Sequence, residues 1–496
     1  MKHESYLLGL DIGSSSVKTA LVDIATGKSV AQAQSPETEM KIDAPQPGWA
    51  EQNPELWWEH AKNGIKKCLA SIDKKKVKAI GIGYQMHGLV IVDRELKPLR
   101  PSIIWCDSRA VEIGNKAFNE LGAEYCLKHL LNSPGNFTAS KLKWVQQNES
   151  SIYNKIHKIM LPGDYIALKL TGEAFTTNTG LSEGMFWDFP SQSISKKLTD
   201  HYGFDSSLIS KQVDVFSNQG TLTKHASEEL GLSSETVVSY RAGDQPNNAF
   251  ALGVVNPGEA AANGGTSGVI YSVADRDVYD PKSRVNAFLH VNHQPQAKRN
   301  GVLLCVNGTG ILNSWLRKNV GSGSYPEMNE QASKVAIGSD GLTFIPFGNG
   351  AERILENKVS QASLQGLDFN RHSQSHLFRA AQEGIVFAFK YGFDILSSMG
   401  ANTSTIKAGE ANLFLSPVFR EAFVNTMNVK LELYDTNGAI GAALGAGVGA
   451  GVYSSIQEAI SGLNKRAEFV AEKEKTQKYL DAYAQWKNKM MDLKLI

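Results

Sequence analysis

An acidic residue followed by a turn of glycine and serine is the first part of the chain that could do chemistry. Asp11 stands at the end of a short apolar run, and Gly13, Ser14 and Ser15 follow closely. Backbone N–H groups and hydroxyls in such a turn can hydrogen-bond phosphate oxygens, while the carboxylate holds Mg²⁺, usually through water. The alternative for the same residues is an ordinary hairpin with an Asx turn, in which the aspartate side chain bonds to the backbone.

A second turn of the same kind lies about 250 residues further along the chain. It has the sequence Gly264-Gly265-Thr266-Ser267-Gly268 and stands between two apolar runs, as the first turn does. Two such turns can clamp the β- and γ-phosphates of a nucleotide from opposite sides. The repeated pattern also indicates two related halves of the chain.

Asp244 is the candidate general base. It follows Gly243 at the end of an apolar run, and Gln245 comes next. A carboxylate in that place can accept a proton from a hydroxyl group. The ordinary pKa of an aspartate, about 3.9, makes it a weak base. A weak base suffices for phosphoryl transfer, because in a loose transition state the proton leaves late. A Gly-Asp pair standing alone is more often a simple turn.

The composition describes a globular chain without a charged surface field. The 496 residues predict about three domains or two large ones, and 42% hydrophobic with 20% charged residues exclude a disordered chain. Lysine and arginine number 51 against 50 aspartates and glutamates, so we expect no nucleic acid and no membrane as partner. The four cysteines form no CxxC pair, and the first apolar run meets an acidic residue too early for a secretory leader. We therefore expect a cytoplasmic protein.

Two common nucleotide-binding motifs are excluded. Gly27-Lys28-Ser29 resembles the end of a P-loop, but Val22 stands where the first glycine must be. No G-x-G-x-x-G segment follows an expected strand and opens a helix, so a nicotinamide-binding fold has little support.

Alternating strands and helices must position the candidate residues. Asn53-Pro54-Glu55 has the N-cap, the proline and the acidic residue typical of a helix start. Strands are expected at 6–12, 17–24, 29–34, 77–84, 89–93, 259–263, 269–273 and 342–346. Further helices are expected at about 375–396 and 472–493. This order predicts an α/β fold, which we divide into residues 1–250 and 251–496.

Seven short segments stand in order along nearly the whole chain. They are GLDIGSSSVK (9–18), GWAEQNPELWW (48–58), QMHG (85–88), WCDSR (105–109), LPGDYIALKLTGE (161–173), Gly243-Asp244 and GGTSG (264–268). Together they resemble the FGGY family of carbohydrate kinases, most closely its xylulokinase branch. QMHG separates the branches best, because the glycerol kinase branch has a different, arginine-containing sequence there.

The resemblance implies two actin-like (ribonuclease H-like) ATPase domains around a central cleft. Residues 1–250 would form an N-terminal domain that binds the sugar and carries the first phosphate turn, and 251–496 a C-terminal domain that binds the nucleotide. The implied reaction transfers the γ-phosphate of ATP, with Mg²⁺, to the C5 hydroxyl of D-xylulose and gives D-xylulose 5-phosphate and ADP. The partners would be the sugar and ATP, and a homodimer is one option for the assembly.

The resemblance also assigns roles by matching position. Asp244 would be the general base and Asp11 would organise Mg²⁺. The implied substrate-binding residues are Met86, His87, Asp107 and Gln245. The implied ATP and phosphate contacts are Gly13, Ser14, Ser15, Gly265, Thr266, Gly409 and Asn412, with the glycine-rich segment 438–445 packed close to the nucleotide. Trp105 is either a ligand contact or a core residue, and Arg109 is either a ligand contact or part of a surface ion pair.

The sequence departs from the family pattern at three places, and one of them, Gln245, leaves the exact sugar open. Ser14 replaces the usual threonine and keeps its hydroxyl. Gln245 replaces the asparagine of xylulokinases and resembles the glycerol kinase branch. Residues 408–412 are Ala-Gly-Glu-Ala-Asn, where the family usually has Gly-Gly-Gly-Ala. The alternatives are a kinase for another ketose or a polyol (L-ribulose, a hexulose or glycerol) and an actin-like ATPase outside metabolism, which would leave QMHG unexplained.

Overall fold

The computed structural model describes residues 5–321 and 323–496, which divide into two compact units. Unit 1 contains the chain up to Gly253, together with Phe288–Arg299 and Thr436–Leu463. Unit 2 contains Val254–Ala287, Asn300–Asp435 and Asn464–Ile496. The units are therefore not two continuous stretches of sequence, and the division of sugar and nucleotide binding between 1–250 and 251–496 stays a prediction.

A five-stranded mixed sheet forms the centre of unit 1. Its strand order is β13-β5-β1-β2-β3. The hairpin β1–β2 and the pair β2–β3 are antiparallel, whereas β5 is parallel to both β1 and β13. The strands are β1 (Tyr6–Ile12), β2 (Val17–Asp23), β3 (Ser29–Ser35), β5 (Val77–Tyr84) and β13 (Val237–Gly243). The carboxyl ends of β1, β5 and β13 consequently meet at one edge of the sheet, which is where open α/β sheets bind ligands.

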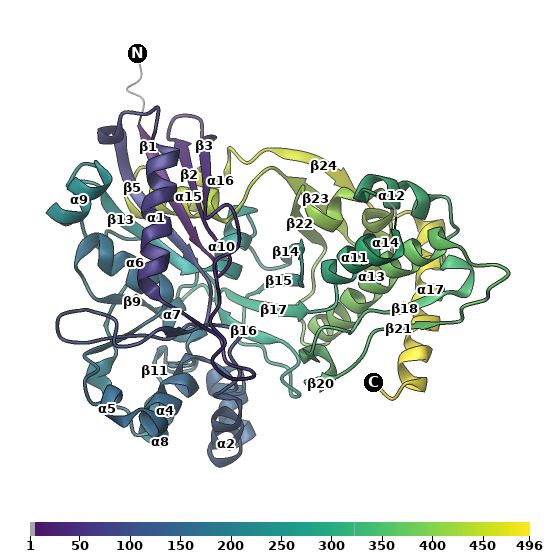
Figure 1. The fold of residues 1–496 in the computed structure, drawn as a ribbon, viewed down its shortest axis with the longest axis horizontal. Helices are drawn as coiled ribbons and strands as arrows, with labels where there is room; N and C mark the ends of the chain where they lie inside the picture. The colour runs from purple at the N-terminus through teal and green to yellow at the C-terminus, as the bar shows by residue number, and fades with distance from the viewer. Residues whose placement is uncertain (1–4, 322) are drawn as a thin grey trace. The chain divides into compact units, whose positions relative to one another are not determined.

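Helices cover both faces of this sheet. Leu8 and Leu10 of β1 join a core with Trp57 of α1 (Pro54–Cys68) and Tyr165 of α6 (Pro162–Thr171). Gly9 lies between the two leucines and faces α15 (Gly438–Gly449) instead, because successive residues of a strand point to opposite faces. In Figure 1 α15, near the C-terminus of the chain, lies beside the purple strands β1 and β2.

The backbone of α15 comes exceptionally close to the strands that it covers. A Cβ on Gly9 would collide with the carbonyl of Ala439, and a Cβ on Gly81 with the carbonyl of Ala442. Within the helix, Gly441 packs on Ala251 and Gly445 on the ring of Tyr240. Protein atoms therefore fill the space in front of these two glycines, and the expectation that 438–445 packs close to a nucleotide stays a prediction.

Unit 2 contains a seven-stranded sheet in the order β16-β17-β15-β14-β22-β23-β24. β14, β15 and β17 are antiparallel neighbours, and β22 and β23 continue the sheet in parallel with β14. This repeats the arrangement of β1, β2, β3, β5 and β13, so the two predicted related halves share one topology. The strands are β14 (Glu259–Gly264), β15 (Gly268–Ala274), β16 (Asn286–Leu289), β17 (Asn300–Val306), β22 (Thr405–Gly409), β23 (Lys430–Tyr434) and β24 (Lys465–Phe469).

Long helices build the core of unit 2. Phe389 of α13 and Phe423 of α14 pack edge to face, and Trp486 of α17 donates its indole N–H to the carbonyl of Phe344 over 3.0 Å. The helices are α11 (Gly310–Leu316), α12 (Tyr325–Ser333), α13 (Gln374–Ser398), α14 (Pro417–Met427) and α17 (Lys473–Asp492). No helix in the described ranges is both long and apolar enough to cross a membrane.

The α/β class and most of the expected elements are confirmed. α13 and α17 match the helices expected at 375–396 and 472–493, and β18 (Thr343–Ile345) lies within the strand expected at 342–346.

Shorter elements also support the site: β4 (Glu51–Gln52), β7 (Ser102–Ile103), α4 (Thr138–Asn148), α7 (Asn178–Glu183) and α10 (Asp244–Ala251). The helix at 438–449 was not expected, because glycine is a poor helix former in isolation.

Replacing Gly9 with alanine tests the close contact with α15. The added methyl group has to displace the backbone of Ala439, so we expect Gly9→Ala to lower the free energy of unfolding by about 1–3 kcal/mol, as overpacked cores do. Urea unfolding measures this loss. The control is Gly462→Ala, since Gly462 is exposed and its Cβ would meet the nearest atom, the carbonyl oxygen of Thr26, at 3.1 Å. Equal stability of the two variants would contradict the prediction.

Candidate active site

Two carboxylates lie at strand ends in unit 1, and the charge of Asp11 makes Asp244 harder to ionise. Asp11 belongs to β1, and Asp244 follows β13 as the first residue of α10. Burial raises the pKa of Asp244 to about 7, and the negative charge of Asp11 adds to the shift. Burial also raises the pKa of Asp11, although Lys18 opposes that shift. Near neutral pH Asp244 is therefore a stronger base than an ordinary aspartate.

Asp11 points toward the N-terminus of α15. A Cβ on Gly438 would stand 2.8 Å from Asp11 Oδ2, so the carboxylate lies against the start of this helix. The backbone N–H groups and the dipole at a helix N-terminus favour negative charge. Asn247 of α10 donates its side-chain N–H to the carbonyl of Gly438 over 2.8 Å, which ties α10 to the same helix end.

The first glycine–serine turn is held by neighbouring side chains. Gln52 donates to the carbonyl of Ser14 over 2.7 Å, and the indole of Trp105 donates to the Ser14 hydroxyl over 3.3 Å. Gly13 N donates to the carbonyl of Ser16, so the turn is closed by its own backbone. The Ser15 side chain stays exposed. The turn thus has a fixed backbone and two hydroxyls at the edge of the sheet.

The segment QMHG leaves the end of β5 beside Asp244. Gln85 N donates to the carbonyl of Ile12 over 2.8 Å, which fixes the start of the segment against β1. Met86 is buried, and its side chain lies where a Cβ on Gly243 would have to go. His87 has a φ of +63°, a left-handed conformation that is rare outside glycine. Such a conformation persists only where the surroundings hold it, and it is frequent at ligand sites.

The His87 ring is fixed from three sides. Its Nδ1 lies 3.0 Å from the carbonyl oxygen of Glu183, and its ring packs edge to face on Phe137 and at a tilt on Phe288. Glu183 itself is buried, and its pKa is raised well above the ordinary value by burial and by the charge of Asp244. No sequence pattern pointed to Glu183, because a single glutamate in a helix is most often exposed.

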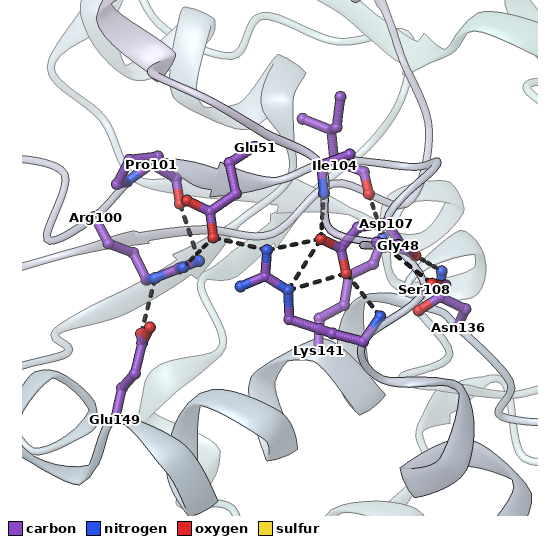
Figure 2. Close-up of polar contacts among 12 residues, drawn as sticks. Gly48, Glu51, Arg100, Pro101, Ile104, Asp107, Ser108, Asn136, Lys141 and Glu149 are labelled. Carbon is purple, nitrogen blue, oxygen red and sulfur yellow. Dashed lines mark hydrogen bonds and ion pairs between the residues drawn. The ribbon is translucent and has the colours of Figure 1, made fainter. Parts of the chain in front are cut away.

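Asp107 does not fit its predicted role as a sugar ligand. The side chain is fully buried, and its carboxylate accepts the backbone N–H of Ala50 over 2.6 Å and that of Arg109 over 2.9 Å. The guanidinium of Arg109 adds two further bonds through Nε and Nη2 at 3.0 and 2.7 Å. These protein donors engage both carboxylate oxygens, so in this structure Asp107 holds the loop together (Figure 2).

Arg109 is structural rather than a surface ion pair. Its guanidinium lies 3.7 Å from the ring centre of Trp49 and 4.8 Å from that of Trp144, and its Nη2 is 2.7 Å from Glu51 Oε1. The segments GWAEQ and WCDSR of the sequence are thus two sides of one packed contact. Trp105, by contrast, is 51% exposed and borders the first turn.

The second glycine turn, in unit 2, is fastened to the start of α11. The carbonyl of Gly265 accepts Gly310 N over 3.0 Å, and the carbonyl of Thr266 accepts Ile311 N over 3.1 Å. The hydroxyl of Thr309 reaches both of these carbonyls at 3.2 and 3.1 Å. The side chain of Thr266 remains exposed and available.

Glu352 is a buried support for this second turn that the sequence did not reveal. Its carboxylate accepts the backbone N–H groups of Asn307 and Gly308, both over 3.1 Å, directly before Thr309. Burial raises the pKa of Glu352 to about 7, while these two hydrogen bonds oppose the shift. The signal was absent because Glu352 is distant in sequence from the turn that it supports.

Gly409 and Asn412 lie beside the second turn, and their contact with a nucleotide stays a prediction. Gly409 ends β22, which is parallel to β14, so both strands finish at the same edge. The Asn412 side-chain nitrogen lies 3.8 Å from where a Cβ on Gly265 would stand. Glu410 is exposed, so water can solvate its charge.

The carboxylates near the first turn suit a hard divalent cation. Asp11 supplies oxygen ligands, and a cation there would relieve the repulsion between Asp11 and Asp244 that raises the pKa of Asp244. Within the described residues no group of three or more histidine, cysteine or acidic side chains could hold a metal. A cation at Asp11 would therefore need further ligands from water and from a bound phosphate.

Several known carbohydrate kinases resemble this chain in sequence and in fold. Residues 6–251 match the profile of the FGGY family of carbohydrate kinases, N-terminal domain. The chain is 28% identical to a xylulose kinase from Bacillus subtilis over 97% of this chain and 96% of that protein. The crystal structure of a xyloylose kinase from Brucella ovis superposes with a TM-score of 0.89, at 26% identity over 98% of this chain and 99% of the other.

A glycerol kinase from Plasmodium falciparum with ADP has the same fold. It matches with a TM-score of 0.87 at 21% identity, over 99% of both chains. These structural relatives, with the topology repeated in units 1 and 2, confirm the expected fold of two actin-like ATPase domains.

Asp11→Asn tests the electrostatic coupling of the two carboxylates. The substitution removes a negative charge that disfavours ionisation of Asp244, so we expect the pKa of Asp244 to fall below about 7. A ¹³C NMR titration of aspartate carboxyl groups, without divalent cations, measures the change. The control Asp481→Asn alters an exposed aspartate of α17 and leaves Asp244 unaffected. An unchanged or higher pKa of Asp244 in Asp11→Asn would contradict the coupling.

Proposed function

We propose that this chain, which belongs to the FGGY family of carbohydrate kinases, transfers the γ-phosphate of ATP to the C5 hydroxyl of D-xylulose. The family supplies the coarser statement, that the protein is a sugar kinase with a sugar and ATP as substrates. The observation that carries the finer one is the pairing of a base with a pKa of about 7, Asp244, with the QMHG segment at the neighbouring strand end.

Met86 and His87 are the proposed sugar contacts, and Gln245 completes them after Asp244. Met86 offers an apolar surface to the carbon chain of the sugar, whereas His87 and Gln245 offer polar groups to its hydroxyls. The fixed ring of His87 favours one orientation of the substrate, because a held side chain loses little entropy on binding.

Asp244 is the proposed general base. As the C5 oxygen bonds to the γ-phosphorus, the bond from phosphorus to the β-bridging oxygen breaks and ADP leaves. The proton of the hydroxyl passes to an Asp244 carboxylate oxygen. In a loose transition state positioning and charge matter more than base strength, and a pKa near 7 keeps part of Asp244 ready to accept the proton.

Asp11 is the proposed anchor of Mg²⁺, mainly through water. When bound, the ion neutralises charge on the phosphate oxygens. The residues proposed for ATP and its phosphates are the first turn, Gly13, Ser14 and Ser15, and in unit 2 Gly265, Thr266, Gly409 and Asn412. Exposed hydroxyls on Ser15 and Thr266, each on a backbone turn held by its neighbours, support this assignment.

A second candidate is a kinase for another ketose or for a polyol. Gln245 favours this second candidate, because it replaces the asparagine of xylulokinases at a position that is part of the proposed sugar contact. The similarity in fold to a glycerol kinase shows that the same architecture occurs with another named substrate.

A panel of sugars with Asp244→Asn tests the proposed activity. Production of ADP would be coupled to a spectrophotometric readout with D-xylulose, other ketopentoses, ketohexoses and glycerol. We expect the highest kcat/KM with D-xylulose and a loss of roughly 10²–10⁴-fold in Asp244→Asn, the usual contribution of a general base. ADP binding by calorimetry should be retained. A higher kcat/KM with another acceptor, or near-normal turnover by Asp244→Asn, would contradict the proposal.

Glu352→Ala tests the nucleotide side. The change leaves the N–H groups of Asn307 and Gly308 without their acceptor and loosens the second turn. We expect KM for ATP to rise by roughly tenfold, the effect of losing a hydrogen bond to a charged group, with KM for the sugar unchanged. Glu356→Ala is the control, since Glu356 pairs with Lys282 at the surface of the same segment. Equal KM values for ATP in both variants would contradict the proposed role of Glu352 in nucleotide binding.

A further inference from the structure

Lys141 is a fully buried lysine that the proposed reaction does not use. It lies on α4, and its Nζ donates to the carbonyl of His87 and to the carbonyl of Ile104, each over 2.9 Å. Figure 2 shows Lys141 beside Ile104 and Asp107. The ammonium therefore bonds to two backbone segments that are distant in sequence from each other and from α4.

Burying an ammonium group is costly unless the protein supplies strong acceptors. Burial lowers the pKa of Lys141 to about 7, although the charge of Asp107 opposes that shift. A methionine or leucine would fill the same space at no electrostatic cost. The specific advantage of a lysine at this position is that its side chain can donate hydrogen bonds to both carbonyls.

The two carbonyls belong to the segments that form the proposed sugar site. His87 has the left-handed backbone conformation that turns QMHG back from the end of β5. Ile104 begins the loop in which Trp105 reaches the Ser14 hydroxyl of the first turn. Asn136, just before α4, also donates to the backbone carbonyl of Asp107 in this loop. Lys141 is a contact common to both segments.

The charge of Lys141 also balances a buried cluster. Arg100 contacts Glu51 over 2.5 Å and Glu149 over 2.8 Å, and Arg109 contacts Glu51 and Asp107, both over 2.7 Å. With Lys141 the cluster, much of which Figure 2 shows, holds three cationic and three acidic side chains. Removing Lys141 in its protonated form would leave one negative charge in excess next to the loop that contains Trp105.

We propose that Lys141 is a positioning residue for sugar binding, which holds the His87 turn and the 104–109 loop in one arrangement. It acts through those backbones and does not touch the substrate. This inference rests on the proposed function only in taking Met86 and His87 as the sugar contacts. Its consequence is selective: Lys141 governs the affinity for the sugar and leaves the affinity for ATP unchanged.

Steady-state kinetics of Lys141→Met test this assignment in the full-length protein. Methionine keeps the length of the side chain and removes both donors. We expect KM for the sugar to rise by roughly ten- to a hundredfold, as for the loss of a hydrogen bond to a charged group, with kcat and KM for ATP within about twofold. Hydrogen–deuterium exchange should speed up in 85–88 and 104–109.

Lys143→Met is the matched control. Lys143 lies on the same helix and also makes two hydrogen bonds, to Gln146 and to the carbonyl of Tyr202, but it contacts neither segment of the sugar site. The Lys143→Met variant should leave the KM for the sugar and the KM for ATP unchanged. Lys141→Gln, which keeps an N–H₂ donor without the charge, should give a sugar KM between those of the wild type and Lys141→Met.

Three outcomes would overturn the inference. They are an unchanged sugar KM in a folded Lys141→Met protein, an equal rise in KM for ATP, and the same sugar KM effect in Lys143→Met. If Lys141→Met does not fold, Lys141→Gln alone decides, and an unchanged sugar KM overturns the inference. The test uses whichever sugar the wild type phosphorylates best, so a failure of the D-xylulose proposal is seen first, in the wild type, and is separate from a failure of Lys141.

Discussion

The close packing of α15 on β1 and β5 is the contact on which the site in unit 1 depends. Only glycine at positions 9 and 81 lets the helix backbone approach the strands, because a Cβ at either would strike a helix carbonyl. That approach brings the N-terminus of α15 to the Asp11 carboxylate. It also allows α10 to bond to the same helix end through Asn247, so that Asp244 starts its helix close to the charge of Asp11.

Buried charges hold the loops around that site. Loops at strand ends lack a ladder of backbone hydrogen bonds, so side chains must supply the missing partners. Lys141 and Asp107 do this for the segments on the sugar side, and Arg109 is enclosed between two tryptophans that keep water away. Such pairs contribute little net stability. Their value here is that they fix the geometry of groups that themselves stay accessible.

The two units support their glycine turns by similar means. In unit 1 Gln52 and Trp105 hold the backbone and hydroxyl of Ser14. In unit 2 Thr309 holds the carbonyl of Gly265, and Glu352 holds the backbone just before Thr309. In each case the supporting residues come from segments far from the turn in sequence. The shared strand order places both turns at the same point of the topology, between the first two strands of a sheet. A turn that is fixed before binding needs to lose less entropy when it meets a phosphate.

The sequence alone determined what local rules control. The strands and their hairpin turns, the ends at which Asp11, Gln85 and Asp244 stand, and the repeat of the glycine turns all follow from periodicity and turn chemistry. Tertiary structure decided the rest, because burial and charge depend on residues brought together from distant segments. It made a helix of the glycine-rich 438–449 by packing it on a sheet, and it turned Asp107 from an expected sugar ligand into a loop anchor. Tertiary structure also determined that Lys141, Glu183 and Glu352 are buried. Nothing in the sequence around a single charged residue distinguishes a buried support from an exposed side chain.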